Sequence, residues 1–506
     1  MRRAAIWVVA GLIVLKLVLV LGTNALTPYG VHRDELLYVA MGRHLDLWRM
    51  DFPPGIALAA EAARAAFGDW LPGLRLLPAC LGALLVALAA LMARELGGGP
   101  YAQGLAALCV VANPLFLRSS VLFQPVVLDQ TAWALGTYAV ILLSKREEPR
   151  YWILLGVAVG LGLLSKFSIG VFAVAAALAV LLTPLRRWLL TPWPWLAVLL
   201  ALLIGSPSLV GQVRLGWPLL SQMGDLREQQ LFRVTQADFA LSQLLLGPTT
   251  LVALLGLVAL LTARVFGTFR AAGWAALVAW LLLVGTRGKA YYYGGMYPLL
   301  YAAGALVLGR IGAPAAGRLV RWGTALLIAA WGTTVLPLGL PIVPPDRMEA
   351  YVRRIGFTRA LRTNTGEYER LPQDYADMLG WEEQVRTVAR VYDSLPPQER
   401  AAAVLLAGNY GEAGAIDLYG PRYGLPGAVS PAGTYWFFGP GRKRGDVVVT
   451  IGIPREGLVE HYAEVIQAAV AGHPYAVAEE RDVPVLVAKQ PRRSLQEIWP
   501  GLAGRH

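Results

Sequence analysis

Cysteine and charged residues are scarce in this chain of 506 residues. Its two cysteines, Cys80 and Cys109, both lie inside apolar runs, so the sequence offers neither a disulfide framework nor a paired-cysteine metal site. Charged residues make up 15% of the chain and hydrophobic residues 56%, whereas soluble proteins average about 25% charged and about 45–50% apolar. This balance argues against an ordinary soluble protein and favours one whose solvent is a lipid bilayer.

The chain also lacks a single basic patch. Its net charge is +12, but the Lys and Arg residues stand in short connectors between apolar runs. Membrane topology requires that arrangement, because cytoplasmic loops carry an excess of Lys and Arg. Nucleic-acid binding is therefore excluded as an interpretation of the charge.

Apolar runs of about 17–22 residues, the length that crosses the hydrocarbon as a helix, recur along the first two thirds of the chain. The first follows Arg2 and Arg3 as in a signal peptide, but no small-residue cleavage site follows cleanly, so we interpret it as an uncleaved span. The sequence predicts a polytopic α-helical membrane protein with about eleven transmembrane helices, near residues 4–22, 73–93, 102–117, 125–143, 151–165, 168–183, 193–210, 243–262, 271–286, 291–309 and 320–340.

Basic connectors alternate along these spans and predict their orientation. They all fall on one side, which the positive-inside rule makes the cytoplasm; they contain Arg2/Arg3, Arg94, Lys145/Arg146/Arg150, Arg186/Arg187, Arg264/Arg270 and Arg310/Arg318/Arg321. The other side then holds long external loops at 23–72 and 211–242 and a tight turn at 287–289. We expect residues 1–343 to form the transmembrane domain.

The composition changes near Pro344, where charged residues and tyrosines become frequent. An odd number of spans exports this tail, so we expect residues 344–506 to form an extracytoplasmic soluble α/β domain. Periodicity predicts a helix over 374–395, short buried strands at 402–406 and 446–451, and a second helix over 454–471.

Asp34 and Glu35 follow the first span on its external side. Two adjacent carboxylates at a membrane surface require hydration, pairing or a use. One interpretation is a solvated helix N-terminus, where acidic side chains complement the helix dipole. The other is a general base, because a carboxylate in such a place can remove the proton of an acceptor hydroxyl.

Further ionisable residues lie at the same rim. Asp129 is expected about one turn inside the fourth span, where it either forms an ion pair with Arg118 or belongs to a functional site. Lys166 ends the fifth span, where it either extends to the interface or holds a phosphate. Arg287 and Lys289 precede Tyr291, Tyr292, Tyr293 and Tyr297, a pattern that fits an aromatic belt or a site for an anionic lipid headgroup.

Carboxylates and cations thus gather on the external face, whereas a transporter needs its binding groups near the bilayer midplane. Together the motifs resemble the membrane glycosyltransferases of family 39, which include protein O-mannosyltransferases and bacterial enzymes that transfer aminoarabinose to lipid A. The resemblance covers nearly the whole chain and rests on Asp34-Glu35, Pro53-Pro54-Gly55, Asp129, Gly162-Leu163-Leu164-Ser165-Lys166, Gly216-Trp217-Pro218, Gly288-Lys289-Ala290-Tyr291-Tyr292 and Tyr297-Pro298.

The resemblance implies a GT-C fold and inverting transfer of a sugar from a polyprenyl-phosphate carrier to an acceptor at the outer face of the cytoplasmic membrane. Asp34 is then the expected base, Glu35 orients the acceptor, and Asp129 completes the acidic site. The donor phosphate is expected on Lys166, Arg287, Lys289 and Arg118, and the substrate site on His32, Tyr291, Tyr292 and Tyr297. Some relatives use a divalent metal ion, for which His32 is a candidate ligand, although one histidine with two carboxylates is weak evidence.

The tail resembles that of a bacterial branch of these enzymes in residues 374–383 and in Asn409-Tyr410-Gly411-Glu412-Ala413-Gly414-Ala415. A sugar-binding or acceptor-binding role is one hypothesis for it. The chain has fewer spans than lipid A-modifying relatives and lacks the extra external repeats of the eukaryotic enzymes, so the sugar and the acceptor do not carry over. A flippase for polyprenyl-linked lipids and a non-catalytic membrane scaffold are the alternative functions.

Overall fold

A computed structural model describes residues 2–502 except 230–234, 245, 312–313 and 364–365. In this structure the chain folds into two compact units. The first, the transmembrane unit, comprises Met1–Leu26, Leu47–Ile56 and Leu74–Ile342. The second, the C-terminal unit, comprises Thr27–Asp46, Ala57–Gly73 and Val343–His506. Two segments of the first external loop therefore fold with the tail, which the sequence did not predict, and the division into 1–343 and 344–506 stays a prediction.

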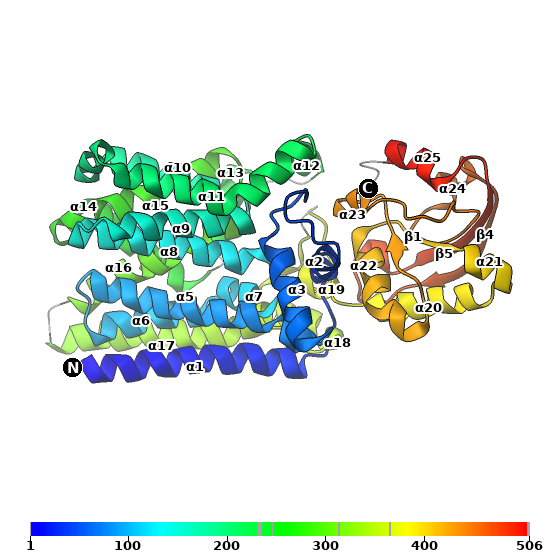
Figure 1. Cartoon of the computed structure of the whole chain (residues 1–506). Coiled ribbons are helices and arrows are strands. Elements are labelled where there is room, and N and C mark those ends of the chain that lie inside the picture. Colours follow the sequence, from blue (N-terminus) through cyan, green and yellow to red (C-terminus); the bar gives the residue numbers. More distant parts are fainter. Residues whose placement is uncertain (1, 230–234, 245, 312–313, 364–365, 503–506) are drawn as a thin grey trace. The chain divides into compact units, whose positions relative to one another are not determined.

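The transmembrane unit is a bundle of long apolar helices that lie side by side (Figure 1). Every predicted span is a helix or contains one. The helices are α1 (Arg2–Leu26), α5 (Leu76–Glu95), α6 (Pro100–Ala112), α7 (Pro114–Val121), α8 (Pro125–Arg146), α9 (Arg150–Ser165), α10 (Ile169–Leu181), η1 (Pro184–Leu190), α11 (Pro192–Arg214), α12 (Pro218–Gln229), α13 (Gln236–Leu244), α14 (Pro248–Thr262), η3 (Arg264–Phe269), α15 (Arg270–Gly285), η4 (Ala290–Met296), α16 (Tyr297–Gly309) and α17 (Pro314–Gly339).

Among the described residues, six helices are long and apolar enough to cross a membrane, or up to nine if each of three bent helix pairs is one span. The bend between α6 and α7 is 62° and that between α10 and η1 is 99°. Both breaks occur where a proline opens the second helix, because proline cannot donate the backbone hydrogen bond that would continue the first. The protein is thus a multi-pass membrane protein, and some of the predicted spans are broken or short helices.

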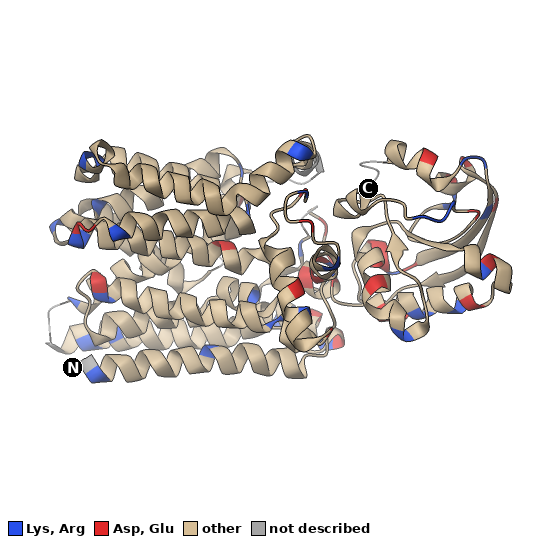
Figure 2. Cartoon of the chain, in the orientation of Figure 1, with Lys and Arg blue, Asp and Glu red and all other residues tan. Residues whose placement is uncertain are grey.

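Lys and Arg of the transmembrane unit stand mainly at helix ends (Figure 2). Glu95, at the end of α5, pairs at 3.0 Å with both Lys145 and Arg146 at the end of α8. Glu147 pairs with Arg187 of η1. These contacts bring three of the basic connectors to one end of the bundle, in agreement with the prediction that they share one side.

The C-terminal unit is built on a five-stranded sheet of order β2-β1-β3-β5-β4. Strands β2, β1 and β3 are parallel, whereas β5 is antiparallel to both β3 and β4. The strands are β1 (Val404–Ala407), β2 (Ala428–Val429), β3 (Val447–Ile451), β4 (Tyr462–Ala471) and β5 (Val483–Pro491). The two predicted strands are confirmed as β1 and β3.

Helices surround this sheet and connect its strands (Figure 1). Those that lie in the C-terminal unit or enter it are α2 (Arg33–Arg43), α3 (Gly55–Phe67), α4 (Leu71–Leu74), α18 (Pro345–Arg354), η5 (Thr358–Leu361), α19 (Gln373–Ala376), α20 (Trp381–Asp393), α21 (Pro397–Ala402), α22 (Tyr410–Tyr419), η6 (Gly420–Tyr423), α23 (Thr434–Phe438), α24 (Arg455–Val459), η7 (Ala478–Glu480), α25 (Leu495–Ile498) and η8 (Trp499–Leu502).

Both faces of the parallel strands β1 and β3 are buried, as expected of parallel strands that form continuous apolar runs. Alternate residues of β1 point to opposite faces. Leu405 joins a core with α20 and α22, whereas Leu406 joins a second core with α24 and α25. The first core also contains Leu36 and Ala40 of α2, so the helix that carries Asp34 and Glu35 is an integral part of the C-terminal unit.

Two predictions for the tail were wrong. The helix expected over 374–395 is interrupted, because Gly380 adopts a left-handed φ of 94° and separates α19 from α20. The helix expected over 454–471 ends at Val459, and its remainder is the edge strand β4, paired with β5. The alanines and valines of β4 are compatible with the periodicity of a helix and with that of a strand. Pairing with β5 makes the segment a strand.

Candidate functional site

Helix α2 begins at the predicted acidic pair. The imidazole Nδ1 of His32 accepts a hydrogen bond from the Asp34 backbone N–H at 3.1 Å, and the Glu35 carboxylate accepts one from the His32 N–H at 2.8 Å. This reciprocal pair is a capping box, which satisfies the free N–H groups of the first turn. Glu35 is wholly buried in this role, so its expected part in orienting the acceptor stays a prediction.

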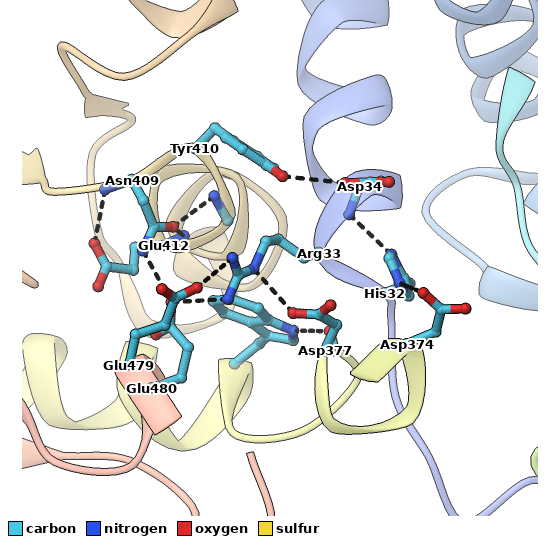
Figure 3. A network of polar contacts seen from close by, with 12 residues as sticks. His32, Arg33, Asp34, Asp374, Asp377, Asn409, Tyr410, Glu412, Glu479 and Glu480 are labelled. Atoms are coloured by element: carbon cyan, nitrogen blue, oxygen red, sulfur yellow. Dashed lines mark hydrogen bonds and ion pairs between the residues drawn. The ribbon is translucent and has the colours of Figure 1, made fainter. Parts of the chain in front are cut away.

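Asp34 is half-buried, and its Oδ1 accepts a hydrogen bond from the Tyr410 hydroxyl at 3.1 Å (Figure 3). Tyr410 opens α22 in the motif that the sequence singled out. Burial and the charge of Asp34 raise the pKa of the Tyr410 phenol well above its ordinary value. The phenol therefore keeps its proton near neutral pH and acts as the donor.

Arg33 lies among the carboxylates of Asp377, Glu479 and Glu480 in the same unit (Figure 3). Its guanidinium pairs at 3.2 Å with Asp377, at 2.6 Å with Glu479 and at 3.5 Å with Glu480. Burial alone would lower the pKa of Arg33, but these acidic neighbours outweigh it and raise the pKa above its ordinary value. Burial raises the pKa of Asp377 and of Glu480, and the Arg33 charge opposes both shifts.

The contacts of Arg33 decide whether the neighbouring side chains can bind a divalent metal ion. His32, Asp374 and Asp377 offer ligand atoms that all lie within 4.8 Å of one another, and imidazole with carboxylates suits several divalent metals. The Asp377 oxygen, however, already pairs with the Arg33 guanidinium, whose charge would repel a metal ion. These side chains do not fit a metal site as they stand.

In the transmembrane unit, Asp129 lies in the second turn of α8 and is only 3% exposed. Its two oxygens accept hydrogen bonds from the Trp133 indole at 3.2 Å and from the Ser168 hydroxyl at 2.8 Å. Ser168 immediately precedes α10. The predicted intramembrane carboxylate is thus held by polar donors on two neighbouring elements.

Lys166 stands in the break between α9 and α10, beside this carboxylate. Its ammonium lies 4.9 Å and 4.7 Å from the ring centroids of Tyr291 and Tyr292, within reach of cation–π attraction. Ser168, two residues later, donates a hydrogen bond to Asp129. The structure therefore brings together four residues that the sequence proposed separately: Asp129, Lys166, Tyr291 and Tyr292.

Small residues allow this approach. A Cβ on Gly295 would lie 2.2 Å from the Trp133 Cβ, so only glycine lets η4, with its tyrosines, come this close to α8. A Cβ on Gly55 would lie 2.4 Å from the Leu164 carbonyl oxygen. The Pro53-Pro54-Gly55 motif therefore packs on the end of α9, two residues before Lys166.

The other predicted residues are less directly connected to this cluster. Arg287 is exposed and has a left-handed φ of 54°, while Lys289 and Arg118 are half-buried. Tyr297 is buried, stacks on Tyr301 and donates to the Gln243 carboxamide. Their assignment to the donor phosphate and to the substrate site stays a prediction.

Sequence reasoning missed several polar residues. Lys16 is wholly buried in α1 and donates to the Phe116 carbonyl of α7 at 2.7 Å; its position inside an apolar run was a signal. Ser168 gave no signal of its own, and Tyr410, although it lies in a motif that the sequence analysis names, has no charge that points to a carboxylate partner.

The chain is similar to known proteins in sequence and in fold. Residues 51–210 match the family model described as dolichyl-phosphate-mannose-protein mannosyltransferase. ArnT from Cupriavidus metallidurans in the apo state has a similar fold, with a TM-score of 0.63 and 16% identity over 98% of this chain and 99% of that one. The resemblance to membrane glycosyltransferases is confirmed.

Further structures share this fold. ArnT from the same organism bound to undecaprenyl phosphate gives a TM-score of 0.59 and 13% identity over 94% of this chain and 97% of that one. The apo oligosaccharyltransferase of Archaeoglobus fulgidus gives 0.51 and 13% identity over 82% of this chain and 63% of that one. No curated protein matches the sequence.

Proposed function

We propose that the protein is an inverting glycosyltransferase that moves a sugar from a polyprenyl-phosphate carrier to an acceptor hydroxyl or amine at the outer face of the cytoplasmic membrane. The observation that carries this proposal is the cluster of Asp129, Lys166, Tyr291 and Tyr292. It joins a cation to a buried carboxylate and two phenols at the ends of membrane helices, in a chain with an ArnT-like fold.

Lys166 is the first candidate for the donor phosphate. An ammonium at the end of an apolar helix can bind the phosphate of a lipid whose chain stays in the hydrocarbon. Tyr291 and Tyr292 fix the ammonium from one side, and Asp129 counters its charge when the phosphate is absent. Arg118, Arg287 and Lys289 would add positive charge as the phosphate leaves.

The helix directions favour the outer face for this chemistry. Helix α9 runs from Arg150, in a basic connector, to Ser165, so Lys166 lies at the end opposite the basic connectors. Helix α8 ends in Lys145 and Arg146, and Asp129 lies at its other end. Because basic connectors mark the cytoplasmic side, both residues would lie at the outer rim, with the tail exported.

Asp34 is the proposed base. It takes the proton of the acceptor as the acceptor oxygen or nitrogen bonds to the anomeric carbon. The bond from that carbon to the phosphate oxygen breaks, and its electron pair leaves with the carrier phosphate. Attack opposite the leaving group inverts the anomeric centre, as in inverting glycosidases. Phosphate needs no proton from a general acid to leave. Glu35 caps the helix that presents Asp34.

The test is transfer by the purified protein in detergent, with a panel of radiolabelled polyprenyl-phosphate sugars as donors and membrane extract as acceptor. Label that moves from one donor to a product supports the proposal and identifies the sugar. No transfer from any donor, together with movement of the labelled donor between the leaflets of liposomes, would replace it with the flippase function.

A further inference from the structure

The turn at Asn409–Glu412 fixes the position of Tyr410. It joins the end of β1 to α22. The Asn409 side chain accepts from the Gly411 and Glu412 backbone N–H groups at 2.8 and 3.0 Å, and the Glu412 carboxylate accepts from Gly408 and Asn409 at 2.9 and 3.0 Å. A doubly capped turn of this kind has little freedom. It fixes Tyr410 at the first position of α22.

Helices α22 and α2 pack closely against each other at Gly414. A Cβ on Gly414 would lie 2.8 Å from the Leu36 Cβ and 3.0 Å from its carbonyl oxygen, so glycine is required where the two helices touch. This contact brings the Tyr410 hydroxyl to 3.1 Å from Asp34 Oδ1.

The same unit also holds the N-terminal turn of α2. The backbone N–H groups of Gly30 and Arg33 donate to the carbonyls of Met378 and Asp377 at 3.2 and 3.0 Å. Arg33 adds the ion pairs with Asp377, Glu479 and Glu480 (Figure 3). The start of α2 is thus anchored to this unit by backbone hydrogen bonds and ion pairs, and the Tyr410 hydroxyl adds a contact to the Asp34 carboxylate itself.

We propose that Tyr410 is a positioning residue for the reaction: its hydroxyl holds the Asp34 carboxylate in the orientation in which Asp34 accepts the proton of the acceptor. This gives the exported tail a role in transfer itself. The inference rests on the proposed function and on Asp34 as its base. A small loss of orientation at a reacting group costs about a hundredfold in rate, so one hydrogen bond can matter here.

Tyr410→Phe is the test, because it keeps the ring that packs between the helices and removes only the hydroxyl. We expect kcat for sugar transfer to fall about 10–100-fold, with KM for the polyprenyl-phosphate donor within about twofold of wild type. The split is informative because a general loosening of the fold would disturb donor binding and turnover together.

Tyr435→Phe is the matched control. Tyr435 also donates to a carboxylate of this unit, but to that of Asp417, a half-buried residue whose Oδ2 lies at 2.7 Å. Its phenylalanine variant reports what the loss of such a bond does to stability alone. We expect it to retain wild-type kcat, and both variants to show the wild-type elution profile and similar melting temperatures.

Asp34→Asn, assayed alongside, separates the two levels of the argument. If Asp34→Asn is inactive and Tyr410→Phe turns over like wild type, the positioning role is wrong and the proposed function stands. If Asp34→Asn retains turnover, the assignment of the base is wrong. A fall in kcat that Tyr435→Phe reproduces would also overturn the inference, because it would trace to stability.

Discussion

Replacing Arg33 by methionine should loosen α2 from the C-terminal unit. The guanidinium is 14% exposed and faces three carboxylates, of which Asp377 and Glu480 have side chains 7% and 1% exposed. Methionine fills much of the space of the aliphatic stem but leaves these two acids without a countercharge. Glu479 is 63% exposed, so water screens it and it adds little.

The expected cost follows from that burial. Removing one partner of a buried ion pair typically destabilises a protein by about 3–5 kcal/mol. Loss of the contact with the Trp381 ring, 5.8 Å from the guanidinium carbon, adds about 0.5–1 kcal/mol. Hydrogen exchange measures the effect locally, and we expect peptides from α2 and α22 to exchange at least about a hundredfold faster at neutral pH, since about 1.4 kcal/mol corresponds to a factor of ten.

Arg64→Met provides the control. Arg64 pairs with Glu61 at 2.7 Å in the same unit, but on an exposed surface of α3, and we expect no change in the exchange of α2. Wild-type protection of α2 in Arg33→Met would refute the reasoning, because it would mean that the three ion pairs do not hold this helix.

Two further predictions concern the donor and the pH dependence of stability. Lys166→Gln should weaken binding of polyprenyl phosphate about ten- to hundredfold, since hydrogen bonds to charged groups contribute about 1.5–3 kcal/mol; isothermal titration should show no such loss for Arg187→Gln at the basic end of the bundle. Burial and the charge of Glu480 raise the pKa of Glu412. The Glu412 carboxyl therefore holds its proton more tightly in the folded state than in the unfolded state. The stability that this proton contributes is lost as pH rises above about 4.3, the ordinary pKa of a glutamate. Glu412→Gln should flatten the fall in melting temperature towards neutral pH, and a variant with the wild-type slope would contradict this.

The membrane half of the fold was predictable because its signal is strong. Long apolar runs located the long helices of the bundle, and the shared side predicted for the basic connectors agrees with the ion pairs of Glu95 and Glu147. The breaks were harder to foresee. Pro114 and Pro184 interrupt apolar runs, and a run of apolar residues does not reveal whether a proline kinks one helix or starts another.

The site was predictable only where a charge interrupts an apolar run or marks a motif. Asp129 and Lys166 stand out in this way, and the structure joins them through Ser168 and the tyrosines of η4. The ion-pair partners of α2 could not be predicted, because Arg33 and Glu480 are far apart in the sequence. The sequence also does not show whether a charged residue is buried or exposed. Pairings of this kind depend on tertiary structure, and no local pattern encodes them.

The central claim is that Asp34 acts as the base in transfer from a polyprenyl-phosphate sugar. Its most direct test is the turnover of Asp34→Asn, with carrier affinity measured in the same preparation and Asp46→Asn, an exposed aspartate of the same unit, as control. We predict that Asp34→Asn binds the carrier like wild type and transfers no sugar, while Asp46→Asn does both. Turnover by Asp34→Asn at the wild-type rate would contradict the account.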